Sequence, residues 1–443
     1  MKIYLRKNFV KRENKLFLSR EKRYSIRKRK LIKRKIKKAS FSIIFFALMI
    51  FAFLVFLILI IFKRKNKRIE FNNQNNIGNI MINKSYIYFN PSPRKEVLLR
   101  GKDYINKCLN DNFVKKFEKV ENPILSIIIP VFNCEKYIKG AISSIQNQNF
   151  TEIEILLIND FSSDKTLNII QEIEQNDKRI KIINNEKNMG SLYSRCIGSL
   201  MAKGAHIFPL DNDDMFFQED VFDSIYKITI KGNFDIIGFK SVYVKNYTDD
   251  INNMVDGFFT YKPNNLILFQ PELGRFSITI NGNYVPNDYT IWGKCIKTEI
   301  YQKATNSMGK ERYSNFLSWA EDSSIIFVIF NIAQSYIFVH KYGIMHLISQ
   351  STATFTQPLK NKLKGEIFLS DVLFDFSKNN SDKDMSAMHA NYIKLKYGLN
   401  NIIENDNIRL YYKTVLEKII NSTYVSPALS NKIKTSIYDK IIN

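Results

Sequence analysis

Two aspartates, Asp211 and Asp213, follow the apolar run HIFPL with one residue between them. Carboxylate oxygens at this spacing can hold a divalent cation and a hydroxyl group of a ligand. A cation that bridges a diphosphate would neutralise the charge of a leaving group. Such a pair also occurs by chance, and Asp214 beside it could simply cap the helix that the following pattern indicates. The pair predicts a metal site only if further polar groups converge on it.

Polar residues end two earlier apolar runs in the same way. One run, ILSIIIP, leads into Phe132 and Asn133, and another, IEILLI, leads into Asn159 and Asp160. An aspartate can accept the imide N–H of a uracil-type base, and an aromatic ring can stack on such a base. Three separate segments therefore predict one site for a base, a ribose and a cation.

The segments that position these residues alternate between two patterns. Continuous apolar runs, as over 124–130 and 153–158, indicate strands buried on both faces, and helical spacing, as over 137–145, indicates helices. A short strand, a helix from about Ser191 and the strand before Asp211 continue the order. Repeated β-α-β units form a parallel sheet that binds ligands at the carboxyl ends of its strands. The polar residues all lie at such ends.

The order and spacing of these segments resemble the family 2 glycosyltransferases with the GT-A fold, over about residues 123–350. The segments are PILSIIIPVFNCEKYIKGAISSIQNQ, EILLINDFSSDKT, NEKNMGSLYSRCIG, HIFPLDNDD, IWGKCIKTEIYQKA and WAEDSSIIF. The resemblance implies an α/β fold with a Rossmann-like, mostly parallel sheet flanked by helices. It also implies inverting transfer of a sugar, with Mn²⁺ or Mg²⁺ as cofactor. The donor would be a nucleotide-diphosphate sugar, UDP-sugar favoured, and the acceptor a hydroxyl of a glycan, glycoprotein or glycolipid.

The nucleotide side of the implied site comes from three of these segments. The resemblance places Pro130 and Phe132 against the base, with Phe132 stacking on it, and Asp160 in a hydrogen bond to the base. Gly190 and Arg195 belong to the segment near the base and the diphosphate.

Acidic residues complete the implied site. Asp211 would bind the ribose and Asp213 the metal, while Glu321 and Asp322 match an acidic pair near the acceptor, with Asp322 as general base. The sequence departs from the common family pattern at two positions, where the family often has Asp and Gly. These are Asn159 and Phe161, and the second could narrow the base pocket.

Three assignments have a structural alternative. Glu321 and Asp322 precede an apolar run, so they could be a first-turn pair favoured by the helix dipole. Trp292 could belong to the core or to an acceptor wall. His346 could complete a metal or diphosphate site, although a single histidine is more often structural.

The segment from Phe41 to Phe62 is apolar over 22 residues except for Ser42. A helix of this length spans about 33 Å, enough for the roughly 30 Å hydrocarbon layer. The first 39 residues hold 18 Lys and Arg, whereas only five follow the helix closely. The positive-inside rule therefore predicts a single-pass type II membrane protein, with its catalytic domain in the Golgi or ER lumen. The four cysteines would face an oxidising compartment, and their pairing does not follow from their spacing.

The net charge of +24 does not indicate a nucleic-acid-binding protein. Residues 1–39 account for +16 of it, and no zinc-finger, helix-turn-helix or RNA-recognition pattern is present. Composition and patterning predict five regions. They are a basic cytosolic tail (1–40), a transmembrane helix (41–62), a stem (63–121), the GT-A domain (122–358) and a helical appendage (359–443).

Two alternatives to a lumenal enzyme stay open at this point. The chain could be a non-catalytic membrane protein that keeps the fold as a binding module. It could also be a synthase whose catalytic domain faces the cytosol and uses lipid-linked acceptors.

Overall fold

The computed structural model describes residues 94–256, 267–269, 277–280, 283–286, 290–348, 358–376, 405–422, 425 and 427–442. The predicted tail and membrane helix (1–62) lie outside these ranges. Within them, no helix is both long enough and apolar enough to cross a membrane. The chain divides into two units, Met1–Met81 and Ile82–Asn443, and the description below concerns the second.

Four parallel strands form one half of the main sheet, in the order β3-β2-β1-β4. The strands are β1 (Leu125–Val131), β2 (Ile153–Asn159), β3 (Ile180–Asn184) and β4 (His206–Pro209). The helices between them are α3 (Ile138–Gln146), α4 (Thr166–Asn176) and α5 (Ser191–Met201). All seven residues of β1 are buried, as its unbroken apolar run predicts. The β-α-β order expected for this region is present.

The other half of the sheet is mixed, which differs from the mostly parallel sheet expected. β11 (Lys294–Lys297) lies between β4 and β6 (Ile236–Val244) and runs antiparallel to both. β12 (Ser335–Leu347) pairs parallel with β6 and antiparallel with β5 (Met215–Phe216). The parallel order ends at β4 because its neighbour β11 runs in the opposite direction.

Shorter strands lie at the margins of this half. Among the described residues, β7 (Val255–Asp256) pairs with β6, and β8 (Ile267–Phe269) pairs with β12. β9 (Ser277–Ile280) and β10 (Asn283–Pro286) form a separate two-stranded sheet.

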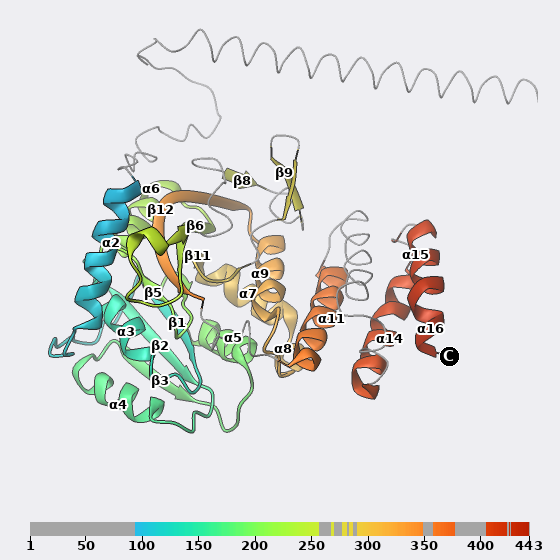
Figure 1. The fold of residues 1–443 in the computed structure, drawn as a ribbon, viewed down its shortest axis with the longest axis horizontal. Coiled ribbons are helices and arrows are strands. Elements are labelled where there is room, and N and C mark those ends of the chain that lie inside the picture. Colours follow the sequence, from blue (N-terminus) through green and yellow to red (C-terminus); the bar gives the residue numbers. More distant parts are fainter. Residues whose placement is uncertain are drawn as a thin grey trace, which may run out of the picture. The chain divides into compact units, whose positions relative to one another are not determined.

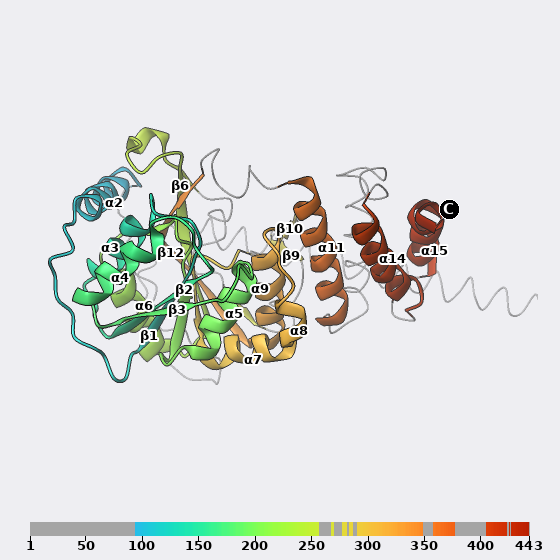
Figure 2. The ribbon, with the colours of Figure 1, turned by 90° about the horizontal axis from the view of Figure 1, so that it is seen from below.

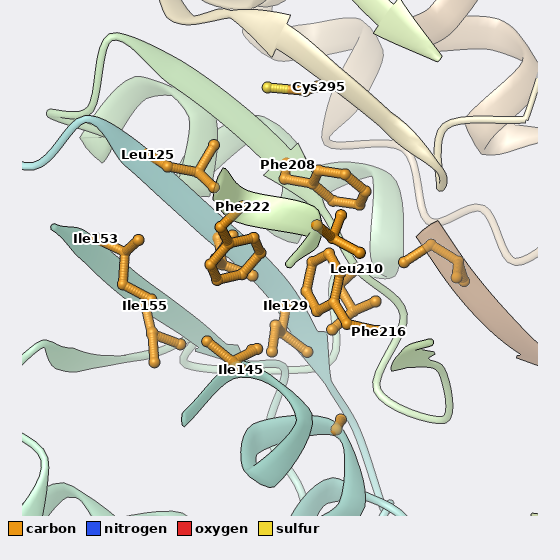
Figure 3. Packing of buried hydrophobic residues seen from close by; sticks show 14 of the residues in the cluster. Leu125, Ile129, Ile145, Ile153, Ile155, Phe208, Leu210, Phe216, Phe222 and Cys295 are labelled. Atoms are coloured by element: carbon orange, nitrogen blue, oxygen red, sulfur yellow. The ribbon is translucent and has the colours of Figure 1, made fainter. Parts of the chain in front are cut away.

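Helices cover both faces of the sheet (Figures 1 and 2). Alternate residues of β1 face opposite layers, as a strand period of two requires. Ile128 packs with α5, α7 (Thr298–Met308) and α9 (Glu321–Ile332). Ile127 and Ile129 pack on the side of α3, α4 and α6 (Val221–Gly232). Figure 3 shows this second layer, in which Ile129 lies beside Phe216, and Ile155 lies near Ile145 and Ile153.

Helix α2 (Arg94–Leu109) falls within the range expected to be a stem, yet it belongs to the folded unit. Leu98, Tyr104 and Ile105 are buried against β5 and β12. A β-carbon at Gly101 would overlap the ring of Phe217, so the helix approaches the sheet closely. The folded unit therefore begins before the boundary at 122.

The described residues beyond 357 are helical. The helices are α11 (Leu359–Phe376), α14 (Asp406–Ile420), α15 (Pro427–Ile433), a π-helix (Lys434–Tyr438) and α16 (Asp439–Ile442). Helix α11 joins two cores, because Phe368 and Val372 pack with α9 whereas Leu363 and Ile367 pack with α14. Arg312 of α8 (Lys310–Tyr313) adds ion pairs to two aspartates of α11. The helical extension is thus attached to the α/β unit through α11.

All four cysteines of the chain lie in the described part, and each is buried and unpaired. They are Cys108, Cys134, Cys196 and Cys295. The structure contains no disulfide bond among them.

Candidate active site

The loops after β1 and β2 are tied to each other at the carboxyl edge of the sheet. The side-chain oxygen of Asn133 accepts a hydrogen bond from the Ser163 N–H at 2.8 Å, and the Asn133 N–H donates to Ser162 Oγ at 3.2 Å. Asn133 and Phe161 both have a positive φ, +46° and +65°. Phe132 of the first loop, predicted to stack on a base, has 43% of its surface exposed. This edge therefore presents an aromatic ring on a tightly bonded pair of loops.

Asp160 organises the loop that leads into α5. Its Oδ1 accepts from the Met189 N–H at 2.8 Å and from Asn185 Nδ2 at 2.7 Å, and its Oδ2 accepts from the Gly190 N–H at 2.7 Å. A carboxylate offers about four acceptor positions, so about one remains for a ligand. The hydrogen bond between Asp160 and a base stays a prediction. The structure shows in addition that Asp160 holds the loop before α5 in place, which the sequence did not indicate.

Arg195 connects the nucleotide side of the predicted site with the acceptor side. Its Nη2 donates to Asp211 Oδ1 at 2.6 Å, and its Nη1 lies 3.5 Å from Glu321 Oε1. Ser191, one turn earlier on α5, donates to the same Glu321 oxygen at 2.7 Å. The guanidinium is almost fully buried, with 6% of the side chain exposed. Residues far apart in the sequence therefore form one buried ionic cluster.

Asp322 stands next to this cluster in the first turn of α9. The first-turn position considered from the sequence is correct for both acidic residues, since Glu321 and Asp322 begin the helix. Burial, followed by the Glu321 carboxylate, raises the pKa of Asp322 to about 7. Burial alone would lower the pKa of Arg195, but the surrounding carboxylates outweigh it and raise that pKa. Asp322 is thus suited to exchange a proton near neutral pH.

The loop with Asp211 and Asp213 is fixed by contacts to neighbouring segments. Asn212 Nδ2 donates to Pro130 O at 2.9 Å, so the predicted base-contact residue Pro130 lies beside this loop. The Tyr247 hydroxyl donates to the backbone oxygen of Asp213 at 2.7 Å. Burial and the carboxylates of Asp214 and Asp211 raise the pKa of Asp213.

Asp214 does not cap a helix, which corrects one alternative drawn from the sequence, because α6 begins only at Val221. It is fully buried, and both of its oxygens lie 2.8 Å from Nδ1 of His346. Trp292 stacks on the His346 ring, with centroids 4.6 Å apart and an interplanar angle of 15°. Trp292 is buried and packs on the histidine, as expected for a core residue, and its place in an acceptor wall stays a prediction.

His346 therefore lies beside the loop that contains Asp211 and Asp213, and its Nδ1 is occupied by the hydrogen bond to Asp214. Burial would lower its pKa, yet the Asp214 carboxylate outweighs burial and raises it. A protonated ring donates from both nitrogens, so a metal at Nε2 would have to displace a proton. A carboxylate that holds the other nitrogen is a common support for a metal-binding histidine.

No three His, Cys, Asp or Glu side chains of the described residues form a cluster that could hold a metal. Burial, followed by the carboxylates of Asp214 and Asp211, raises the pKa of Asp213, and a cation at this loop would compensate the negative charge. That Asp213 holds a metal stays a prediction.

The acceptor-side loop before α9 is held from two directions. Gly190 has φ +88°, and a β-carbon there would lie 2.8 Å from Leu317 O, so this glycine lets the nucleotide-side loop approach closely. From the other side, Trp319 Nε1 donates to Glu366 of α11 at 3.1 Å. A β-carbon at Gly365 would overlap Trp319 O. Ala320, the residue before Glu321, has φ +57°.

The sequence indicated the acidic residues Asp160, Asp211, Asp213, Glu321 and Asp322, but not the side chains that contact them or their loops. Ser191, Asp214, Tyr247 and Glu366 each contact a predicted site residue or its loop. Only Asp214 carried a visible signal, as the third aspartate of DNDD.

Comparison with known proteins finds a family match for part of the chain and a similar fold. Residues 126–282 match the model for glycosyl transferase family 2. Over 93 residues the chain is 44% identical to an uncharacterized glycosyltransferase of Haemophilus influenzae, which covers 21% of this chain and 29% of that protein. Over 114 residues it is 37% identical to a chondroitin synthase of Escherichia coli, covering 24% and 16%. The chain thus spans less than a third of the length of these relatives.

Among solved structures, residues 1–349 of S. aureus TarS in complex with UDP-GlcNAc have a similar fold. The TM-score is 0.50 at 15% identity, over 72% of this chain and 89% of that one. Residues 126–282 therefore match a glycosyl transferase family 2 model, and the mixed α/β fold is similar to that of the TarS segment.

Proposed function

We propose that this chain transfers a sugar from a nucleotide-diphosphate donor to a hydroxyl group, with inversion at the anomeric carbon. The family 2 segment supports sugar transfer, and the relatives it matches are named glycosyltransferases or synthases. The observation that carries the proposal is the Arg195 cluster, which brings Asp211 of the nucleotide side and Glu321 of the acceptor side onto one guanidinium. We favour a UDP-sugar as donor and a glycan, glycoprotein or glycolipid as acceptor.

Asp322 is the proposed general base. It removes the proton from the acceptor hydroxyl, and that oxygen attacks the anomeric carbon as the bond to the diphosphate breaks. A pKa near 7 allows the carboxylate to take a proton at neutral pH. Glu321 is held by Ser191 and faces Arg195, so it orients the cluster beside the base.

Asp213 is the proposed ligand of Mn²⁺ or Mg²⁺, with donor phosphates and water completing the coordination. Such a cation supplies charge neutralisation for the departing nucleotide diphosphate. His346 is a second candidate ligand through Nε2, and its Nδ1 bond to Asp214 would orient the ring.

Nucleotide binding tests this proposal directly. The full-length chain, purified in detergent, is heated with UDP and Mn²⁺, and an increase in melting temperature is expected that Asp213→Ala abolishes. Screening UDP- and GDP-sugars for hydrolysis then identifies the donor. A chain that binds UDP and Mn²⁺ but hydrolyses no donor would favour the non-catalytic binding module, and no binding at all would refute the proposal.

We further propose that residues 41–62 anchor the chain as a single-pass type II membrane protein with its catalytic unit in the lumen. The charge difference across this apolar segment supports that orientation. Protease treatment of sealed vesicles tests it, because a lumenal unit stays intact until detergent is added. Digestion without detergent would instead support the cytosol-facing synthase.

A further inference from the structure

Phe161 combines two unfavourable features. Its φ is +65°, in the left-handed region where a β-carbon is crowded, and 58% of its surface is exposed to solvent. Glycine would avoid both the backbone strain and the exposed apolar ring. Local folding therefore does not explain a phenylalanine at this position, and strained residues of this kind often serve a ligand site.

The position of Phe161 is defined by the pairing of two strands. It follows Asp160 at the carboxyl end of β2, and the Asp160 N–H donates to Val131 O at the end of β1 at 2.8 Å. Phe132 follows Val131 directly, and Asn133 bonds the segment just after Phe161. The two phenylalanines thus leave the same edge of the sheet from neighbouring parallel strands.

Both rings are available to a ligand. Phe132 is 43% exposed, and neither ring belongs to a buried cluster. Neither has an aromatic partner within the described part of the chain. The bonds of Asn133 and Asp160 fix the backbones that carry them, so the rings are presented without further ordering of the loops.

We propose that Phe161 is a second aromatic contact for the base of the donor nucleotide, beside Phe132. This rests on the proposed function, and it names the ligand of Phe161 as the flat π-face of a nucleobase. Stacking on a ring tolerates any base, because every base has such a face. Phe161 would therefore supply affinity for the nucleotide, while Asp160 and the pocket edges select the base.

Three substitutions separate stacking from backbone strain. Phe161→Gly removes the ring and the strain, Phe161→Ala removes only the ring, and Phe161→Trp keeps an aromatic face. Both small residues should weaken UDP binding by at least about fivefold, the lower end of the range for a base–aromatic contact. The Gly variant alone should also melt about 2 °C higher, since it relieves the left-handed strain. The Trp variant should retain UDP affinity, with indole fluorescence that changes as UDP binds.

The assay is titration calorimetry on the full-length chain in detergent, with UDP and, separately, with inorganic pyrophosphate, each in the presence of Mn²⁺. Because pyrophosphate has no base, its affinity should be the same in wild type, Phe161→Gly and Phe161→Ala. Ile230→Ala, at another exposed apolar residue, is the control for nonspecific loss.

Three results have distinct meanings. A wild-type chain that binds neither ligand contradicts the proposed function itself. If the wild type binds UDP and the Gly and Ala variants stay within twofold of it, Phe161 does not contact the base. An equal loss for UDP and pyrophosphate would show a distorted loop, and would also overturn the assignment.

Discussion

The two sides of the candidate site are positioned by different means. On the nucleotide side, Asp160 and Asn133 bond backbone groups of adjacent loops, all within the segment that matches the family model. On the acceptor side, the loop before α9 depends on Trp319 and on Glu366 of α11, both beyond residue 282. The difference indicates that the loops around Asp160 are held within their own segment, whereas the loop before α9 depends on later parts of the chain.

This difference has a functional consequence. Changes on α11 should alter the rate of transfer or the use of the acceptor, while nucleotide affinity stays the same. Changes around Asp160 should weaken nucleotide affinity and leave the use of the acceptor unchanged.

The largest effect is expected for Asp322→Asn, which removes the proposed base. Transfer should fall by about 10²- to 10⁴-fold, the usual contribution of general base catalysis. UDP affinity should not change, because the nucleotide side does not depend on this side chain. Steady-state rates and calorimetry with UDP measure the two quantities, with Glu299→Gln of α7 as an exposed control. Full activity in Asp322→Asn would remove the base assignment.

The dependence of transfer on pH should come from the same residue. The base acts when deprotonated, and its raised pKa means that the proton is lost only near pH 7. The rate should therefore rise with pH and, below pH 7, fall by about tenfold per unit. A rate that is constant between pH 5 and pH 7 would show that the working base has an ordinary carboxylate pKa.

A smaller effect is expected for Glu366→Leu, which removes the acceptor of the Trp319 Nε1 hydrogen bond. We expect a decrease in kcat of about fivefold, corresponding to about 1 kcal/mol for a lost buried hydrogen bond. Glu366→Gln keeps an acceptor oxygen and should restore most of the rate. Unchanged UDP affinity in both variants would support this difference between the two sides, and a parallel loss of affinity would contradict it.

The last prediction concerns the stability of the fold rather than the rate, at the contact between the two sides. Gly190→Ala forces a β-carbon into a positive-φ position 2.8 Å from Leu317 O, whereas Gly309→Ala imposes similar strain, at φ +79°, with no atom within 4 Å. Each should cost about 1–3 kcal/mol of strain, or a few degrees in melting temperature. The extra loss in Gly190→Ala measures the contact with Leu317. Equal melting temperatures for Gly190→Ala and Gly309→Ala would mean that the loops at Gly190 and Leu317 are not in close contact.

The parallel half of the fold was predictable because each strand is a continuous apolar run. β1 and β2 stand out in this way, and the polar residues that end them indicated the site edge. Helix α2 was missed although Leu98, Tyr104 and Ile105 lie at helical spacing, because charged residues separate them and lower the mean hydropathy. The antiparallel β11 has only four residues, too few for a pattern.

The supporting contacts of the site could not be predicted because they join distant parts of the chain. His346 and Asp214 are 132 residues apart, and Ser191 and Glu321 are 130 apart. Sequence spacing carries no information on such pairs, which arise only when β12 and α9 pack beside the first sheet half. The resemblance supplied Asp211, Arg195 and Asp322, but not the ion pairs by which Arg195 joins Asp211 to Glu321.

The four buried thiols of the chain lie in different layers of the fold, so the opening of each layer can be followed separately. Cys108 lies on α2, Cys134 follows β1, Cys196 lies on α5 and Cys295 lies on β11. Burial raises the pKa of all four, so little reactive thiolate forms while the fold is closed. The rate at which a maleimide labels each thiol therefore reports how often its own layer opens, without any engineered probe.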